Sequence, residues 1–151
     1  MRRSERGFTL VEIMIVVAII ALLAAIAIPN VLRGRATANE TAAVGNLRAL
    51  LSSLEMYRSV NNAYPTAWSS MGVASPAFYP MPFQTIASVV QGYTYAYTGG
   101  NAVYTMTAVP QVNAGGRAFF VQQDGLVRHC LGSTAPDSAY TTISEPPTNC
   151  P

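Results

Sequence analysis

The chain has 151 residues, a formal net charge of +2 and an apolar fraction of 50%, whereas only 11% of its residues are charged. This length suits one domain of ordinary size. All 9 basic residues are arginine, and residues 1–7 hold three of them and one acid, so the rest of the chain is neutral. A neutral chain lacks the overall positive field on which nucleic-acid binding depends, and we expect no specific nucleic-acid partner.

The first predicted element is an apolar run over residues 8–28, broken only by Thr9 and by one charged residue, Glu12. As a helix this run would be about 31 Å long, close to the roughly 30 Å of a bilayer's hydrocarbon core. A charge inside such a segment is costly and points to a function. Three arginines precede the run and two follow it, which favours a cytoplasmic N-terminus by the positive-inside rule.

Three interpretations of residues 8–28 are open: a signal anchor, a cleaved secretory signal with a small-residue site at Ala25-Ile26-Ala27, and a membrane-stored subunit whose helix later packs in an assembly. The length of the run and its glutamate disfavour the secretory signal. Pro29 favours the third interpretation, because it predicts a kink at the membrane boundary beyond which an amphipathic pattern resumes. A small-residue stripe that would let helices approach closely also favours it, formed by Ala18, Ala21 and Ala25.

Residues 29–62 are predicted to continue as an amphipathic helix that ends at the paired asparagines Asn61 and Asn62. Together with residues 8–28 this makes one helix of roughly 50 residues, kinked at Pro29, of which only the second half needs a covering partner. The apolar stripe consists of Val44, Leu47, Leu51 and Leu54, broadened by Leu50 and Tyr57.

The partner is predicted to be a small antiparallel sheet of about four strands. After a connection over residues 63–91, alternating patterns and turn signals predict strands at 93–98, 102–109, 117–122 and 126–130. Gly99-Gly100-Asn101 is expected to be a turn, and Asp124-Gly125 a hairpin. The short spacing implies a meander that covers the helix, which gives an α+β fold with residues 29–151 as one globular domain.

Three tyrosines at alternate positions, Tyr93, Tyr95 and Tyr97, would share one face of this sheet. Packing in the core is expected of them, with a ligand-binding platform as the alternative. The acids after the helix, Asp124, Asp137 and Glu145, are too scattered for a calcium site, and no metal is predicted. The sequence also lacks nucleophile, phosphate-loop and dinucleotide motifs, so we expect neither an enzyme nor a cofactor.

Both cysteines, Cys130 and Cys150, lie in the last quarter of the chain. A disulfide between them would close a loop of about 20 residues and contribute on the order of 3 kcal/mol to stability. This pairing indicates an oxidising compartment. Zinc is a poor alternative because His129 is the one histidine of the chain.

The string RGFTLVEIMIVVAIIALLAAIAIPN resembles the N-terminus of type IV pilins and of type II secretion pseudopilins, over roughly residues 4–65. The resemblance implies a pilin fold and a leader, residues 1–7, that a membrane prepilin peptidase removes between Gly7 and Phe8. The same family activity N-methylates the new N-terminus, Phe8. Glu12 matches the family's glutamate, which pairs with the N-terminus of a neighbouring subunit.

The physics of the segment agrees with that role, because a carboxylate is stabilised near a helix N-terminus and would neutralise an ammonium group at Phe8. Glu12 could also pair with its own terminus or reach the headgroups. The predicted assembly residues are Phe8, Glu12, Ala18, Ala21, Ala25 and Pro29.

The resemblance implies a structural subunit, held in the bacterial inner membrane with its bulk in the periplasm. It would polymerise with copies of itself and related pilins, on an inner-membrane platform, into a surface filament for adhesion, twitching motility or DNA uptake. The alternative is a pseudopilin of a type II secretion system, with a periplasmic filament. The cysteine pair favours a pilin. A third possibility is a membrane-anchored monomer whose sheet binds a ligand.

Overall fold

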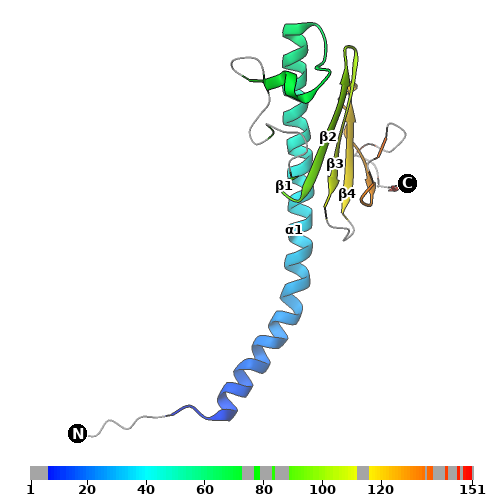
Figure 1. Cartoon of the computed structure of the whole chain (residues 1–151). Helices are drawn as coiled ribbons and strands as arrows, with labels where there is room; N and C mark the ends of the chain where they lie inside the picture. The colour runs from blue at the N-terminus through cyan, green and yellow to red at the C-terminus, as the bar shows by residue number, and fades with distance from the viewer. Residues whose placement is uncertain are drawn as a thin grey trace, which may run out of the picture. The chain divides into compact units, whose positions relative to one another are not determined.

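A computed structural model of the chain describes residues 7–72, 77–78, 83, 89–111, 116–134, 136–137, 142, 146 and 148–150. The chain divides into two compact units, Met1–Thr37 and Ala38–Pro151. The expected α+β pilin-like fold is confirmed, with one long helix followed by a sheet (Figure 1). The elements are α1 (Leu10–Asn61), the 3₁₀ helix η1 (Trp68–Gly72), β1 (Val89–Val90), β2 (Tyr93–Gly100), β3 (Val103–Pro110), β4 (Arg117–Gln122), β5 (Arg128–Leu131) and β6 (Thr148–Asn149).

Helix α1 has 52 residues and contains Pro29 without being ended by it. The kink expected at this proline stays a prediction. The helix ends where Asn62 adopts a left-handed conformation, with φ of 54°, and donates its N–H to the Arg58 carbonyl at 2.8 Å. Asparagine tolerates this conformation better than most residues, so it caps a helix C-terminus effectively.

The second half of α1 lies along one face of the sheet, beside β2, β3 and β4 (Figure 1). Its buried residues, apart from Ser53, recur every three or four positions, as one face of a helix requires. Val44 and Leu51, which the sequence placed in the stripe, are only partly buried and lie at its margin. The covered residues are Ala43, Leu47, Leu50, Ser53 and Leu54.

The sheet has six strands in the order β1 to β6, so the prediction of about four was wrong in number. The two additional strands, β1 and β6, have 2 residues each, too few for an alternating pattern to be recognised. Each strand pairs antiparallel with the next, except that β5 and β6 run parallel. β6 lies in the tail that the disulfide ties back to β5.

The hairpin between β2 and β3 is tighter than predicted. Gly99 and Gly100 belong to β2, with Gly100 opposite Val103, so the turn consists of Asn101 and Ala102. A Cβ at Gly99 would collide with the Tyr97 hydroxyl and the Pro65 carbonyl. Tyr97 donates its hydroxyl to that carbonyl at 2.6 Å, so the glycine is needed for close approach rather than for a turn.

Aromatic side chains dominate the core between α1 and the sheet. Tyr93 and Tyr95 are 3% and 1% exposed, and Tyr97 packs against the same cluster, which confirms the predicted packing role of these tyrosines. The indole of Trp68 in η1 is buried and donates to the Phe83 carbonyl at 2.8 Å. Edge-to-face pairs such as Tyr64 with Tyr104, whose ring centroids are 4.7 Å apart, fill the interior.

The predicted disulfide between Cys130 and Cys150 is present and joins residues 20 positions apart. Cys130 lies in β5, and Cys150 directly follows β6 and donates its N–H to the Leu131 carbonyl at 2.9 Å. The covalent bond and the β5–β6 pairing therefore fasten the same two segments together.

Candidate assembly site

The residues before α1 leave the predicted processing site accessible. Gly7, Phe8 and Thr9 precede the helix and are exposed, and the Phe8 side chain is 83% exposed. A Cβ added at Gly7 would meet no atom within 4 Å. The peptide bond between Gly7 and Phe8 therefore lies in non-helical chain that the described residues do not cover, as a peptidase would require.

The start of α1 is built by a reciprocal pair of side chains, Thr9 and Glu12. The Thr9 N–H and hydroxyl both donate to Glu12 Oε2, each at 2.8 Å, while the Glu12 N–H donates to the Thr9 hydroxyl oxygen at 3.2 Å. This arrangement is a capping box, in which threonine and glutamate three residues apart satisfy donors at the helix end. Glu12 thus has a partner within its own chain, and its second carboxylate oxygen can take another.

The first unit of the chain exposes nearly all of its apolar side chains. Leu22, Leu23 and Ile26 are 65%, 62% and 61% exposed within the subunit. Among the described residues, α1 is the one helix long and apolar enough to cross a membrane by length and composition, and no part of its apolar window is buried. The predicted stripe residues Ala18, Ala21 and Ala25 are likewise exposed. This surface needs lipid or another protein to cover it.

Of the predicted assembly residues, the structure places all on α1 or just before it, and it joins Glu12 to Thr9 rather than to Phe8. Thr9 was missed in the sequence interpretation, although the spacing threonine-x-x-glutamate is itself a signal for a capping box. The part that a second subunit plays for Glu12 stays a prediction.

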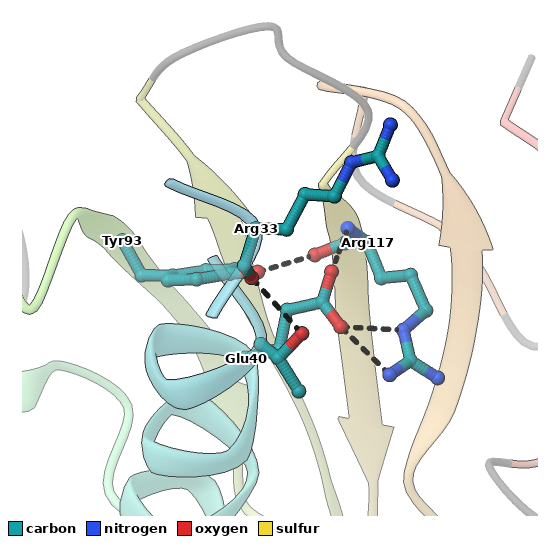
Figure 2. Close-up of polar contacts among 5 residues, drawn as sticks. Arg33, Glu40, Tyr93 and Arg117 are labelled. Carbon is teal, nitrogen blue, oxygen red and sulfur yellow. Dashed lines mark hydrogen bonds and ion pairs between the residues drawn. The ribbon is translucent and has the colours of Figure 1, made fainter. Parts of the chain in front are cut away.

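The second unit carries a polar contact that the sequence interpretation also missed, between Glu40 of α1 and Arg117 of β4 (Figure 2). The Arg117 Nε and Nη2 donate to Glu40 Oε2 at 2.8 and 2.7 Å, and the Arg117 backbone N–H donates to Oε1 at 3.2 Å. Tyr93 of β2 donates its hydroxyl to the Arg117 carbonyl at 2.9 Å. We call Glu40, Tyr93 and Arg117 the helix–sheet clamp.

Burial sets the electrostatics of the helix–sheet clamp. The side chain of Glu40 is only 13% exposed and that of Arg117 is 35% exposed, so the ion pair is screened less than a surface pair. Burial, followed by the nearby Glu40 charge, raises the pKa of Tyr93 far above its ordinary value of 10.0, so this hydroxyl stays a donor. A separation of 77 residues left no local sequence signal for the pair.

At the β4–β5 turn, Asp124 is held by an ion pair and by a backbone hydrogen bond. Arg128 donates to Asp124 Oδ2 at 2.7 Å, and the Leu126 N–H donates to Oδ1 at 2.9 Å. The Arg128 hydrogen bond lowers the pKa of Asp124. Gly125 follows with φ of 72°, which glycine adopts without strain. The residues named suffice to form the hairpin.

An exposed apolar helix with a capped glutamate, joined to a disulfide-closed sheet domain, defines a pilin-like class of subunit. Residues 2–28 match the family described as the prokaryotic N-terminal methylation motif. The chain is 37% identical over 111 residues to the type IV wide pilus major component PilA4 of Thermus thermophilus, a match that covers 70% of this chain and 83% of that protein. The chain therefore belongs to the family of type IV pilins and type II secretion pseudopilins.

Type II secretion proteins are similar over a shorter stretch. The chain is 40% identical over 84 residues to the type II secretion system core protein G of Dickeya chrysanthemi, covering 54% of this chain and 55% of that protein. It is 40% identical over 83 residues to the core protein G of Pseudomonas aeruginosa, covering 54% and 58%. The chain thus spans a little over half the length of these relatives. No solved structure matches the chain.

Proposed function

We propose that the chain is a type IV pilin, a non-catalytic subunit that is cut between Gly7 and Phe8 and polymerises through α1 into a surface filament. The observation that carries this is the unburied apolar half of α1, with Glu12 near its start. Such a surface is stable in a bilayer before assembly and among other helices afterwards. We place the N-terminus in the cytoplasm and the sheet domain in the periplasm, where the disulfide forms.

Processing and assembly are linked in this proposal. Removal of residues 1–7 by a prepilin peptidase creates an ammonium group at Phe8, which the family's activity methylates. The Glu12 carboxylate can then accept a hydrogen bond from the ammonium group of the next subunit. It keeps its bonds to Thr9, because two carboxylate oxygens are available. Pairing the two charges in an apolar setting removes the cost of leaving either one alone. Ala18, Ala21 and Ala25 permit the close helix contact, and an inner-membrane platform performs the addition.

A pseudopilin is the second candidate, because type II secretion core protein G relatives are similar over about half of this chain. The pilus relative supports the first candidate more strongly, since its match extends over 70% of the chain and so past α1 into the sheet domain. The two filaments differ in location. A pilus projects from the cell, whereas a pseudopilus stays in the periplasm.

Location and secretion together test this choice. Deletion of the gene is expected to remove sheared surface filaments while leaving the release of folded exoproteins unchanged. Loss of exoprotein release with intact surface filaments would instead identify a pseudopilin. Mass spectrometry of the subunit from filaments is expected to find N-methylated Phe8 as the first residue, and a subunit that retains Met1 would contradict the processing step.

The role of Glu12 needs variants that separate its charge from its capping bonds. Glu12→Gln keeps a side chain that can form a capping box but removes the charge, whereas Thr9→Ala keeps the charge and removes the cap. We expect Glu12→Gln to lower filament yield at least about 100-fold, because the N-terminal ammonium loses its partner. Thr9→Ala should lower yield far less. Equal yields from wild type and Glu12→Gln would contradict the intersubunit role.

A further inference from the structure

The second half of α1 carries a row of residues on a face that the sheet leaves exposed. Its members recur at alternating spacings of three and four, which keeps them on one side of a helix. Three of them are small, and a Cβ added at the first, Gly45, would meet no atom within 4 Å. The row, which we call the outer row, consists of Gly45, Arg48, Ser52, Glu55 and Ser59, all of them exposed.

The outer row carries one positive and one negative charge, and both have bonding capacity left. Arg48 lines a pocket of about 390 Å³, and within the described part of the chain no hydrogen bond or ion pair engages its guanidinium. Glu55 lines a second pocket, of about 370 Å³, and its side chain is 45% exposed.

One carboxylate oxygen of Glu55 is open to a partner from another chain. Its Oε1 accepts a hydrogen bond from the Tyr64 hydroxyl at 2.6 Å. Arg58 Nη1 lies 3.9 Å from Oε2, which is too far for a hydrogen bond. Glu55 Oε2 can therefore accept a hydrogen bond from a guanidinium group, the donor that pairs best with a carboxylate.

The spacing of the two charges prevents them from pairing within one helix. Arg48 and Glu55 are seven residues apart, about two turns or roughly 10 Å along the axis, whereas side chains that meet on a helix are three or four residues apart. Ser52 and Ser59 donate their hydroxyls to carbonyls of α1 itself, at 3.1 and 2.7 Å, so they need no partner from another chain. The face thus presents a cation and an anion separated by small residues.

A second copy of the same face is complementary to this one when it is displaced along the axis. In the proposed topology all copies enter the bilayer in one direction, so their helices run parallel. Copies at the same level would place Arg48 against Arg48 and Glu55 against Glu55, which is repulsive. A displacement of seven residues places Glu55 of one copy level with Arg48 of the next, and the small residues let the backbones approach closely.

The displaced arrangement also leaves room for further copies. In a displaced pair, one copy keeps an unpaired Arg48 and the other keeps an unpaired Glu55. A third copy can pair with either, so the contact repeats along an axis instead of closing on a dimer. The charge pattern of the outer row therefore suits an open assembly of parallel copies.

We propose that the outer row of α1 packs on the outer row of a second copy displaced by about seven residues, with Arg48 of one copy donating to Glu55 Oε2 of the next. The inference rests on the proposed polymerisation and adds a second charged contact to the one at Glu12. The exposed apolar side chains of α1 make similar contacts at many displacements. A charged pair is satisfied at one displacement, so it fixes the register between subunits.

Two charge reversals test the contact in the full chain. Arg48→Glu and Glu55→Arg, each expressed alone, are expected to lower filament yield at least about tenfold, because like charges then meet between copies. Expressed together, the two variants should restore the yield in filaments that contain both in equal amounts, since each supplies the charge that the other lacks. Such rescue cannot arise within a subunit. An intact Cys130–Cys150 bond in each variant shows that the sheet domain has folded.

Ala49→Glu is the matched control. It adds a charge at an exposed position next to Arg48 but about 100° around the helix from it, and should leave the filament yield unchanged. An equal defect in this control would overturn the assignment of the contact to the outer row.

The remaining outcomes separate the two proposals. Absence of filaments from the wild-type chain would overturn the proposed polymerisation. Wild-type filaments together with normal yields from Arg48→Glu and Glu55→Arg would overturn the outer-row contact alone. Defects in the single variants that coexpression does not repair would overturn the pairing of these two residues between copies.

Discussion

The two units of this chain use similar apolar residues in opposite ways. In Ala38–Pro151 the apolar side chains cover one another, and Leu47, Leu50 and Leu54 are 0% exposed. In Met1–Thr37 the leucines and isoleucines of α1 are mostly more than half exposed. Ala38–Pro151 buries its hydrophobic surface when it folds, whereas Met1–Thr37 leaves its hydrophobic surface exposed, to be covered by lipid or by further subunits. The difference teaches that burial within a subunit and burial in its environment are separate requirements, met by separate parts of one helix.

The largest expected effect comes from matched leucine truncations in the two units. Leu47→Ala removes a side chain with 0% exposure and is expected to lower the free energy of unfolding by about 2–5 kcal/mol. Leu22→Ala removes one that is 65% exposed and should change it by less than about 0.5 kcal/mol while lowering filament yield. Denaturant titration of the detergent-solubilised chain, followed by Trp68 fluorescence, measures both. Equal losses of stability in Leu47→Ala and Leu22→Ala would contradict the difference in burial between the two units.

A smaller effect is expected from the helix–sheet clamp. Glu40→Gln weakens a mostly buried pair and should lower the free energy of unfolding by about 2 kcal/mol, less than for a fully buried pair because Arg117 is 35% exposed. Glu55→Gln is the control, since the Glu55–Arg58 contact is 3.9 Å long with side chains 45% and 54% exposed, and a glutamine oxygen can still accept the hydrogen bond that the Tyr64 hydroxyl donates to Glu55 Oε1. It should change stability by less than about 0.5 kcal/mol. A larger loss from Glu55→Gln than from Glu40→Gln would show that burial does not decide how much each ion pair contributes to the free energy of unfolding.

The smallest effect near neutral pH comes from the tyrosines, all of which lie in the second unit. Burial raises the pKa of Tyr64, Tyr95, Tyr97 and Tyr104 above 10.0, as it does for Tyr93. The unfolded chain therefore ionises first as pH rises, so this stability is complete below about pH 10 and is lost above it. In an alkaline titration, the part of the tyrosinate absorbance that belongs to these five residues should change together with Trp68 fluorescence. Ionisation of these five tyrosines near pH 10 without unfolding would contradict the burial.

The elements that the sequence predicted correctly are those with a long periodic pattern of apolar residues. The apolar run, the amphipathic stripe around Leu47 and Leu54, and the four longer strands all repeat over many residues, so their patterns are strong. β1 and β6 have 2 residues each and owe their pairing to neighbours in the fold rather than to a pattern. Gly99 was assigned to a turn because glycine commonly marks one, whereas here it makes room for the Tyr97 hydroxyl.

The functional residues likewise divide into those with a local sequence signal and those without one. Gly7, Phe8 and Glu12 form one short motif, and the resemblance of that motif to a family can be recognised from the residues alone. Thr9 belongs to the motif, and its local spacing was sufficient to predict the cap. Glu40 and Arg117 are 77 residues apart, and only the packing of β4 on α1 brings them together. Contacts between distant elements depend on tertiary register, which a single sequence does not specify.

The two-residue outer strands affect how readily subunits aggregate at high concentration. A long exposed edge offers a row of unpaired backbone groups on which other chains can add strands, the route to amyloid-like aggregation. Here the sheet ends in β1 on one side and in β6 on the other, and β6 is also fastened by the neighbouring Cys150. β1 and β6 themselves give a foreign strand few backbone partners, because each has 2 residues. Short edge strands disfavour strand addition, whereas the unburied apolar half of α1 favours association through the helix.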